Sequence, residues 1–84
     1  MDRFEEWKDQ IREYCMKNGL SFAKASEMIK CSNNNMLALQ YYEPESGKMG
    51  LLDETPMPAV LMVFRDGEGV RIEQTEHTKK YLTA

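Results

Sequence analysis

The sequence predicts an α+β protein in which two N-terminal helices pack on one face of a mostly antiparallel four-stranded sheet, a meander, to which the C-terminal residues can add a short helical turn. Apolar residues repeat with helical spacing in residues 1–31, whereas residues 36–75 hold short apolar or alternating runs separated by turn residues. Its 84 residues suffice for one modest core. We therefore expect a single domain over residues 1–84, with a helical hairpin over 1–31 and an antiparallel sheet over 36–75.

The first helix is predicted by one apolar stripe near the N-terminus. Acidic residues crowd its first half and Lys17 lies near its end, an arrangement that suits the helix dipole. Gly19 follows, and glycine is the usual residue just beyond the end of a helix. The stripe consists of Phe4, Trp7, Ile11, Tyr14 and Cys15.

A second, shorter helix is expected to begin after Ser21, a good N-cap residue. The spacing of its apolar residues gives a buried face. The polar residues 32–35 favour a loop, so we expect this helix to end around residues 30–31. The buried face comprises Phe22, Ala25, Met28 and Ile29.

Two turn signals divide the rest of the chain into strands. Pro44 and Gly47 predict a hairpin loop over residues 43–48, and Asp66-Gly67 predicts a second hairpin. The expected strands are residues 36–42, 48–52, 59–64 and 70–75. The third of these is apolar at every position, so it should lie at the centre of the sheet or have its second face covered by a partner.

Residues 21–42 also fit the apolar rhythm of a helix-turn-helix, the alternative interpretation, which predicts a DNA-binding regulator. Ser26 takes the small position, residues 30–32 the turn, and Met36 and Leu39 the anchors. However, Lys30 stands where that turn usually has glycine, and residues 31–47 contain no lysine or arginine to bind phosphates or guanine. We therefore prefer a strand over residues 36–42 and do not expect a nucleic-acid partner.

Composition points to a soluble protein of the cytoplasm. Eleven basic and fourteen acidic residues give a formal charge of −3, which lacks the basic footprint of a nucleic-acid binder. No secretory signal or membrane-spanning run is apparent, so we expect no membrane association. In that setting Cys15 and Cys31 are expected to stay reduced.

The residues that usually carry catalysis are sparse. The single histidine, His77, lies in a charged tail, and Cys15 lies on the apolar stripe, where thiols are inert. Their spacing does not match a zinc site, and Gly67 and Gly69 belong to a hairpin turn rather than a phosphate loop. We therefore expect no enzyme activity, cofactor or metal.

The remaining signals concern the surface, where the candidate partner-binding residues are Tyr41, Tyr42, Met57 and Met62. Adjacent tyrosines in a strand face opposite sides, so one should be available for contact. Met57 lies between two prolines, and methionine adapts to permissive binding surfaces. The leading hypothesis is a small protein-binding or accessory and inhibitory module, of phage or mobile-element type, that can form a homodimer through its sheet; its protein partner is not identified by the sequence.

Overall fold

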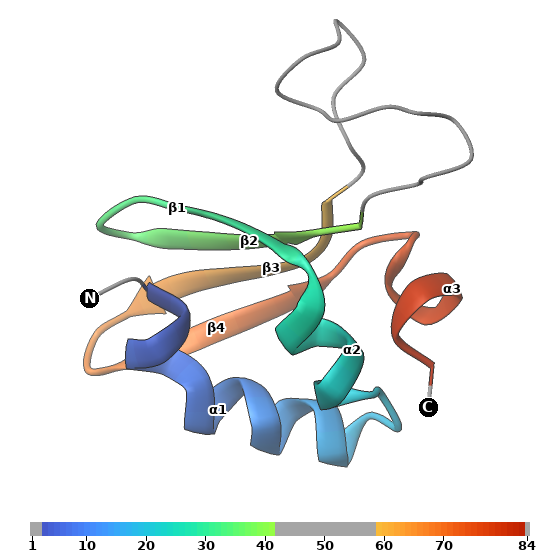
Figure 1. Ribbon diagram of the computed structural model, residues 1–84. Coiled ribbons are helices and arrows are strands. Elements are labelled where there is room, and N and C mark those ends of the chain that lie inside the picture. The colour runs from blue at the N-terminus through green and yellow to red at the C-terminus, as the bar shows by residue number, and fades with distance from the viewer. Residues whose placement is uncertain (1–2, 42–58, 84) are drawn as a thin grey trace, which may run out of the picture.

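The computed structural model describes residues 3–41 and 59–83 and shows the α+β fold that the sequence predicts (Figure 1). Four antiparallel strands form one sheet in the order β1-β2-β3-β4, a meander. Two helices precede the sheet and a short helix follows it. The elements are α1 (Arg3–Lys17), α2 (Phe22–Glu27), β1 (Ile29–Ser32), β2 (Met36–Gln40), β3 (Ala59–Asp66), β4 (Gly69–Gln74) and α3 (Thr78–Leu82).

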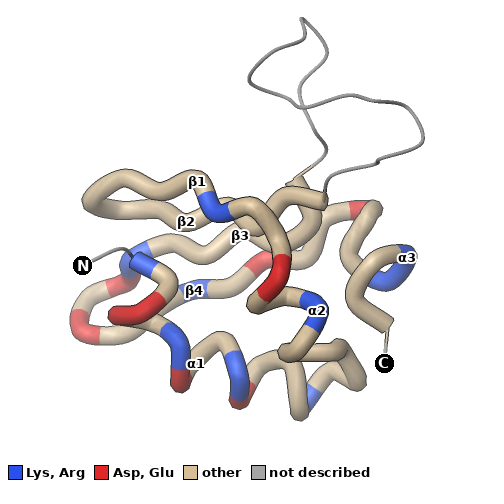
Figure 2. The backbone as a smooth tube through the Cα atoms, viewed as in Figure 1, with Lys and Arg blue, Asp and Glu red and all other residues tan. Residues whose placement is uncertain are grey.

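Helix α1 follows its predicted apolar stripe. Phe4, Trp7, Ile11 and Cys15 are all buried, and Ile11 and Cys15 are fully so. Gly19 ends the helix with a φ of +68°, in the left-handed region that glycine adopts without a steric penalty. Charged residues of both signs alternate along the rest of the helix (Figure 2), and these pair with one another, as expected of a solvated face.

Helix α2 is shorter than the sequence analysis predicted. The Ser21 side chain caps it by accepting a hydrogen bond of 3.2 Å from the Lys24 amide. The helix ends at Glu27, because Met28 takes extended dihedrals (φ −74°, ψ 159°). The expectation that it continues through Ile29 to residues 30–31 is therefore wrong. The helical hairpin, predicted to extend to residue 31, ends at Glu27.

Residues Ile29–Ser32 instead form the edge strand β1, which pairs with β2 over four residues. The polar residues 33–35 become the turn between these strands. The Asn33 side chain accepts a hydrogen bond of 2.8 Å from the Asn35 amide, and the Asn33 amide donates to the Met36 carbonyl at 2.9 Å. A side chain of this type mimics a backbone turn, which explains why the asparagine cluster closes a hairpin here.

Strand β2 decides between the two interpretations of residues 36–42, a strand or a recognition helix. Met36–Gln40 is a strand with neighbours on both sides, so the recognition helix required by a helix-turn-helix does not form there. The predicted hairpin loop at 43–48 and the predicted strand at 48–52 lie outside the described residues.

Strand β3 occupies an interior position between β2 and β4, one of the two arrangements predicted for its doubly apolar sequence. Leu61 and Val63 are fully buried, as are Leu37 and Leu39 opposite them on β2. These four side chains share the face against which α1 and α2 pack. The turn to β4 is a two-residue loop that begins at Gly67 (φ +61°), as the Asp66-Gly67 signal predicts.

Helix α3 confirms the short C-terminal helical turn and is anchored to the start of β3. Thr78 is fully buried; its hydroxyl donates to the Val60 carbonyl and accepts from the Thr75 amide at 2.8 Å. Leu82, also fully buried, brings the end of the chain back to the core, where Thr83 pairs with Leu20. The Thr78 hydroxyl therefore joins the last helix to the central strand.

Replacing Thr78 by valine should lower the free energy of unfolding by about 1–3 kcal/mol, because valine keeps the shape but removes the two hydrogen bonds of a buried hydroxyl, each worth about 0.5–1.5 kcal/mol. Urea denaturation followed by circular dichroism measures this difference. The control Thr78→Ser keeps the hydroxyl and removes one methyl group, worth about 0.8 kcal/mol, so it should be the more stable variant. A valine variant as stable as the natural protein would contradict the anchoring role.

Candidate functional site

The first candidate site is the face of the sheet turned away from α1 and α2. Residues directly opposite one another in antiparallel strands share a face, so the register defines its composition. One row crosses all four strands and a second crosses three. The rows are Cys31, Ala38, Met62 and Glu73, and Met36, Phe64 and Arg71. We name these seven residues the open face.

The strand residues that alternate with the open-face residues contact helix α1, which shows that the helices lie on the opposite side of the sheet. Lys30 places its ammonium 4.4 Å from the centre of the Phe4 ring of α1. The Gln74 amide donates to the Tyr14 hydroxyl at 3.0 Å. Lys30 and Gln74 neighbour open-face residues along their strands and therefore point to the opposite side of the sheet.

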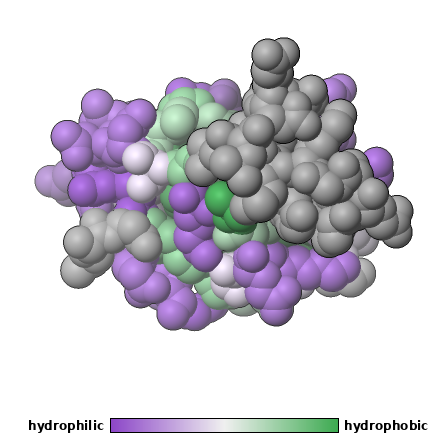
Figure 3. Space-filling model, turned by 45° about the horizontal axis from the view of Figure 1, so that its top comes forward, coloured by the Kyte–Doolittle hydropathy of each residue, from purple (hydrophilic) through white to green (hydrophobic). Residues whose placement is uncertain are grey.

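The open face combines an apolar centre with a charged margin. Met36, Met62 and Phe64 are each half-buried. At the margin on β4, the Arg71 guanidinium lies 4.5 Å from the centre of the Phe64 ring and 2.6 Å from a carboxylate oxygen of Glu73. Figure 3, which brings the upper side of the molecule forward, shows hydrophobic residues gathered beside hydrophilic ones. Strand β2 and most of β3 carry no charge (Figure 2).

The structure places two of the four candidate partner-binding residues. Met62 lies at the centre of the open face, in register with Ala38 and Glu73. Tyr41 follows β2 and is half-buried, packed against the core. Tyr42 and Met57 lie outside the described residues.

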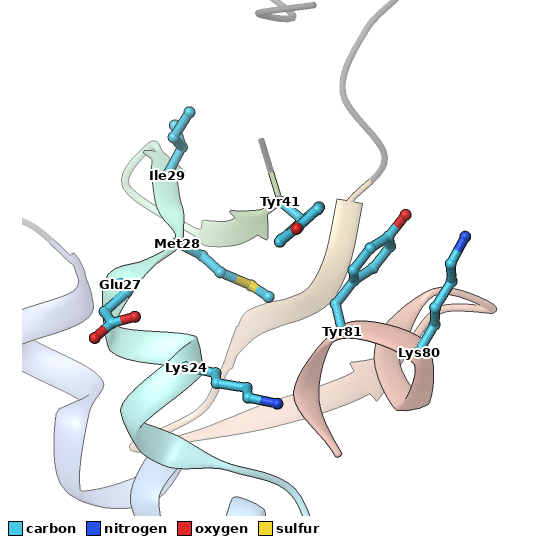
Figure 4. Close-up of a pocket in the computed structure, with 7 residues that line it drawn as sticks. All are labelled: Lys24, Glu27, Met28, Ile29, Tyr41, Lys80 and Tyr81. Atoms are coloured by element: carbon cyan, nitrogen blue, oxygen red, sulfur yellow. The ribbon is translucent and has the colours of Figure 1, made fainter. Parts of the chain in front are cut away.

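Tyr41 belongs to a second candidate site, a pocket of about 480 Å³ between the end of α2, the end of β2 and α3. Its ring stacks on that of Tyr81 with centroids 4.0 Å apart and planes 19° from parallel. In Figure 4, Met28 extends from the end of α2 toward the two tyrosines and Lys24 extends toward α3, whereas the carboxylate of Glu27 and the ammonium of Lys80 point away from the other lining side chains. The pocket is lined by Lys24, Glu27, Met28, Ile29, Tyr41, Lys80 and Tyr81.

Two ammonium groups border the pocket. Lys24 Nζ donates to the Thr83 carbonyl at 3.1 Å, which holds this side chain across the gap between α2 and α3. Lys80 Nζ lies 5.1 Å from the centre of the Tyr81 ring, within the range of a cation–π interaction. The pocket therefore has an aromatic and thioether wall, and its two lysine ammonium groups lie on different sides of Tyr81 (Figure 4).

Most of this pocket has no signal in the sequence. Tyr81 lies in a charged segment 40 residues from Tyr41, and nothing in either local pattern indicates that their rings stack. In α3, the spacing of Thr78 and Leu82 marks the buried side of the helix, and Tyr81 is not one of these residues. The first open-face row was also missed in part, because its Cys31 lies in β1, most of which the sequence analysis assigned to a helix.

The structure also places Cys15 and His77, the two residues that the sequence analysis considered for catalysis. Cys15 is fully buried in α1, and burial raises the pKa of its thiol, which disfavours the nucleophilic thiolate. His77 precedes α3, where its Nε2 lies 3.5 Å from Glu76. Within residues 3–41 and 59–83, no group of three or more His, Cys, Asp or Glu side chains could hold a metal ion.

Comparison with known proteins adds no relative. No family model, curated protein or solved structure matches the chain. None of the helices in the described parts of the chain is long and apolar enough to cross a membrane.

Stability above neutral pH should depend on the Cys15 thiol. Because its pKa is raised in the folded state, the folded protein holds this proton more tightly than the unfolded chain. Its contribution is complete below the unfolded-state thiol pKa, about 8.5, and is lost as the pH rises from there through the folded-state pKa. Urea unfolding between neutral and alkaline pH should therefore show a steeper decline in the natural protein than in Cys15→Ala. Identical slopes would contradict the assignment.

Proposed function

We propose that this protein is a non-catalytic protein-binding module and that it binds through its open face. The observation that carries the proposal is the apolar centre formed by Met36, Ala38, Met62 and Phe64 on the side of the sheet away from α1 and α2. Methionine adapts its shape to a partner, and both methionine and aromatic residues are enriched in protein interfaces.

The first partner we propose for this face is a second copy of the chain. A two-fold symmetric contact brings a surface against itself, so the surface must be complementary to itself. The open face meets this requirement because its centre carries no charge and its margin carries one residue of each sign, Arg71 and Glu73. Two copies can therefore bury the apolar centre while each Arg71 finds a carboxylate.

The compartment we propose is the cytoplasm. Both cysteines are free, with Cys15 in the core and Cys31 on the open face, and free thiols of this kind are the usual state in a reducing compartment. The non-catalytic part of the proposal is supported by the raised pKa of the Cys15 thiol. An accessory or inhibitory role follows if the dimer presents its remaining surface to a further protein.

Sedimentation equilibrium should show a reversible dimer for the natural protein and a weakened dimer for Met62→Lys. The new ammonium can pair with Glu73 in the monomer, so the fold is kept, but it becomes buried and charged in the dimer. A symmetric dimer brings one such ammonium from each copy into the apolar centre, and this like-charge contact costs about 3 kcal/mol, which raises the dissociation constant about a hundredfold.

Met16→Lys is the matched control, because Met16 is 75% exposed on α1, far from the open face in the fold. It should dimerise as the natural protein does. A natural protein that stays monomeric at its highest soluble concentration, or a dimer weakened equally by both substitutions, would contradict the proposal.

A further inference from the structure

We infer that strand β4 pairs along its outer edge with β4 of a second copy of the chain, so that the two sheets join into one. This contact is separate from the open face and does not depend on the function proposed for that face. The inference rests on three observations: the backbone groups that β4 directs outward, the difference between the two edges of the sheet, and the order of the charges along β4.

Alternate residues of β4 direct their backbone groups away from β3. The Thr75 amide donates to the Val60 carbonyl at 3.4 Å. On the opposite edge of β3, the Arg65 amide donates to the Asn35 carbonyl at 2.9 Å. Because hydrogen-bonded and non-hydrogen-bonded pairs alternate along an antiparallel ladder, these two bonds determine which groups of β4 face outward. They belong to Val70, Ile72 and Gln74.

The two edges of the sheet differ in how well they are protected against pairing. Edge strands are usually protected by short length, by proline or lysine, or by charged residues that point inward. Strand β1 is only four residues long, and its Lys30 ammonium is turned inward over the Phe4 ring. Strand β4, the outermost strand on the other side (Figure 1), has six residues and contains neither proline nor lysine. In the described part of the chain, no other backbone group bonds to its outward amides.

The charges of β4 select a second copy as the partner. A two-fold axis through Ile72 places this residue opposite its own counterpart, and Arg71 directly opposite Glu73 of the second copy. That pair is a non-hydrogen-bonded one, in which opposing side chains lie closest and opposite charges are stabilising. Arg71 and Glu73 are about half exposed and lie 2.6 Å apart within one strand. In the joined sheet each charge therefore has a neighbour of opposite sign along its own strand and another across the axis.

The same charges disfavour the other antiparallel registers. An axis through Arg71 or through Glu73 places two like charges directly opposite each other, which is destabilising. An axis through Val70 leaves Arg71 opposite Gly69 and Glu73 beyond the end of the second strand. The register centred on Ile72 is the one in which both charges find a partner.

The side of β4 that faces α1 also admits a second copy. An open groove of about 380 Å³ lies between α1 and β4, and Val70 and Ile72 line it while half-buried. Glu13 and Lys17 line it from α1 and pair with each other at 2.9 Å, so this margin carries one charge of each sign and does not repel its counterpart. Pairing centred on Ile72 brings the two Ile72 side chains together on this side of the joined sheet.

The test is amide exchange with water, measured residue by residue by NMR on the full chain in dilute and concentrated samples. The Ile72 amide faces outward, so it should be protected only in the joined sheet. Because only the unpaired fraction exchanges, a sample that is about nine-tenths paired should slow this amide about tenfold relative to the dilute sample. In a mixture of differently labelled copies, a contact between the α protons of Arg71 and Glu73 of different copies reports the register. A contact through the open face alone changes neither measurement, since the outward amides lie in the plane of the sheet.

The variant Val70→Pro removes an outward amide and no hydrogen bond of the single chain. Proline is tolerated where the amide of an edge strand faces outward, and Gly69 before it adapts to the restriction that proline imposes. This variant should lose the concentration dependence at Ile72, while the Arg71 amide, which faces β3, stays protected and shows that the hairpin is intact. Val70→Ala is the matched control, because it shortens the same side chain but keeps the amide, and it should pair as the natural protein does.

The inference is overturned if the Ile72 amide exchanges at the same rate in dilute and concentrated samples of the natural protein. It is also overturned if the concentration dependence persists in Val70→Pro, or if Val70→Ala loses it as fully as Val70→Pro does. A contact between copies that joins Arg71 to Arg71 contradicts the register.

Discussion

The fold depends on one constraint, the burial of the strand β3. Its first six residues are apolar at every position, and such a strand favours an interior place in a sheet, with hydrogen-bonded neighbours on both edges. The structure provides the neighbours by placing β2 and β4 on either side. It covers one face with α1 and α2, whose side chains surround Leu61 and Val63. The other arrangements in the chain, including the early end of α2, serve this central position: residues after Glu27 extend into β1 and complete the sheet rather than add a helical turn.

Both candidate sites follow from that constraint. Two short helices cover one face, so the second face of β3 presents Met62 and Phe64 beside the apolar residues of β2, and this is the surface for which a second copy of the chain is proposed. The start of β3 is held by Thr78, which fixes α3 at the end of the sheet and brings Tyr81 onto Tyr41. The lining of the pocket beside this stack includes Lys24, Glu27 and Lys80, whereas the centre of the open face is uncharged. The two sites therefore differ in lining as well as in position.

The sequence predicts the parts of the fold that local pattern determines. The stripe of α1, the turn at Asp66-Gly67 and the interior place of β3 each follow from a spacing or a turn residue that acts within a few positions. The strand β1 was missed because Met28 and Ile29 continue the helical spacing of α2, and no local signal reveals that residues 36–40 pair with this segment instead. For the same reason Met62 could be chosen as a surface residue while the Tyr41–Tyr81 stack could not, since that contact spans 40 residues. The proposals for Tyr42 and Met57 stay predictions.

The central claim, that β3 is buried on the face of α1 and α2 and more accessible on the face of Met62, is tested most directly by the accessibility of its own side-chain methyl groups. NMR of methyl-labelled protein with a soluble gadolinium chelate measures this at successive residues, because Leu61, Met62 and Val63 alternate between the two faces. At low protein concentration the account predicts strong attenuation of the Met62 methyl signal and none for Leu61 or Val63, with Met62 regaining protection as the concentration rises. A Met62 methyl as protected as its neighbours in the dilute protein would contradict the account.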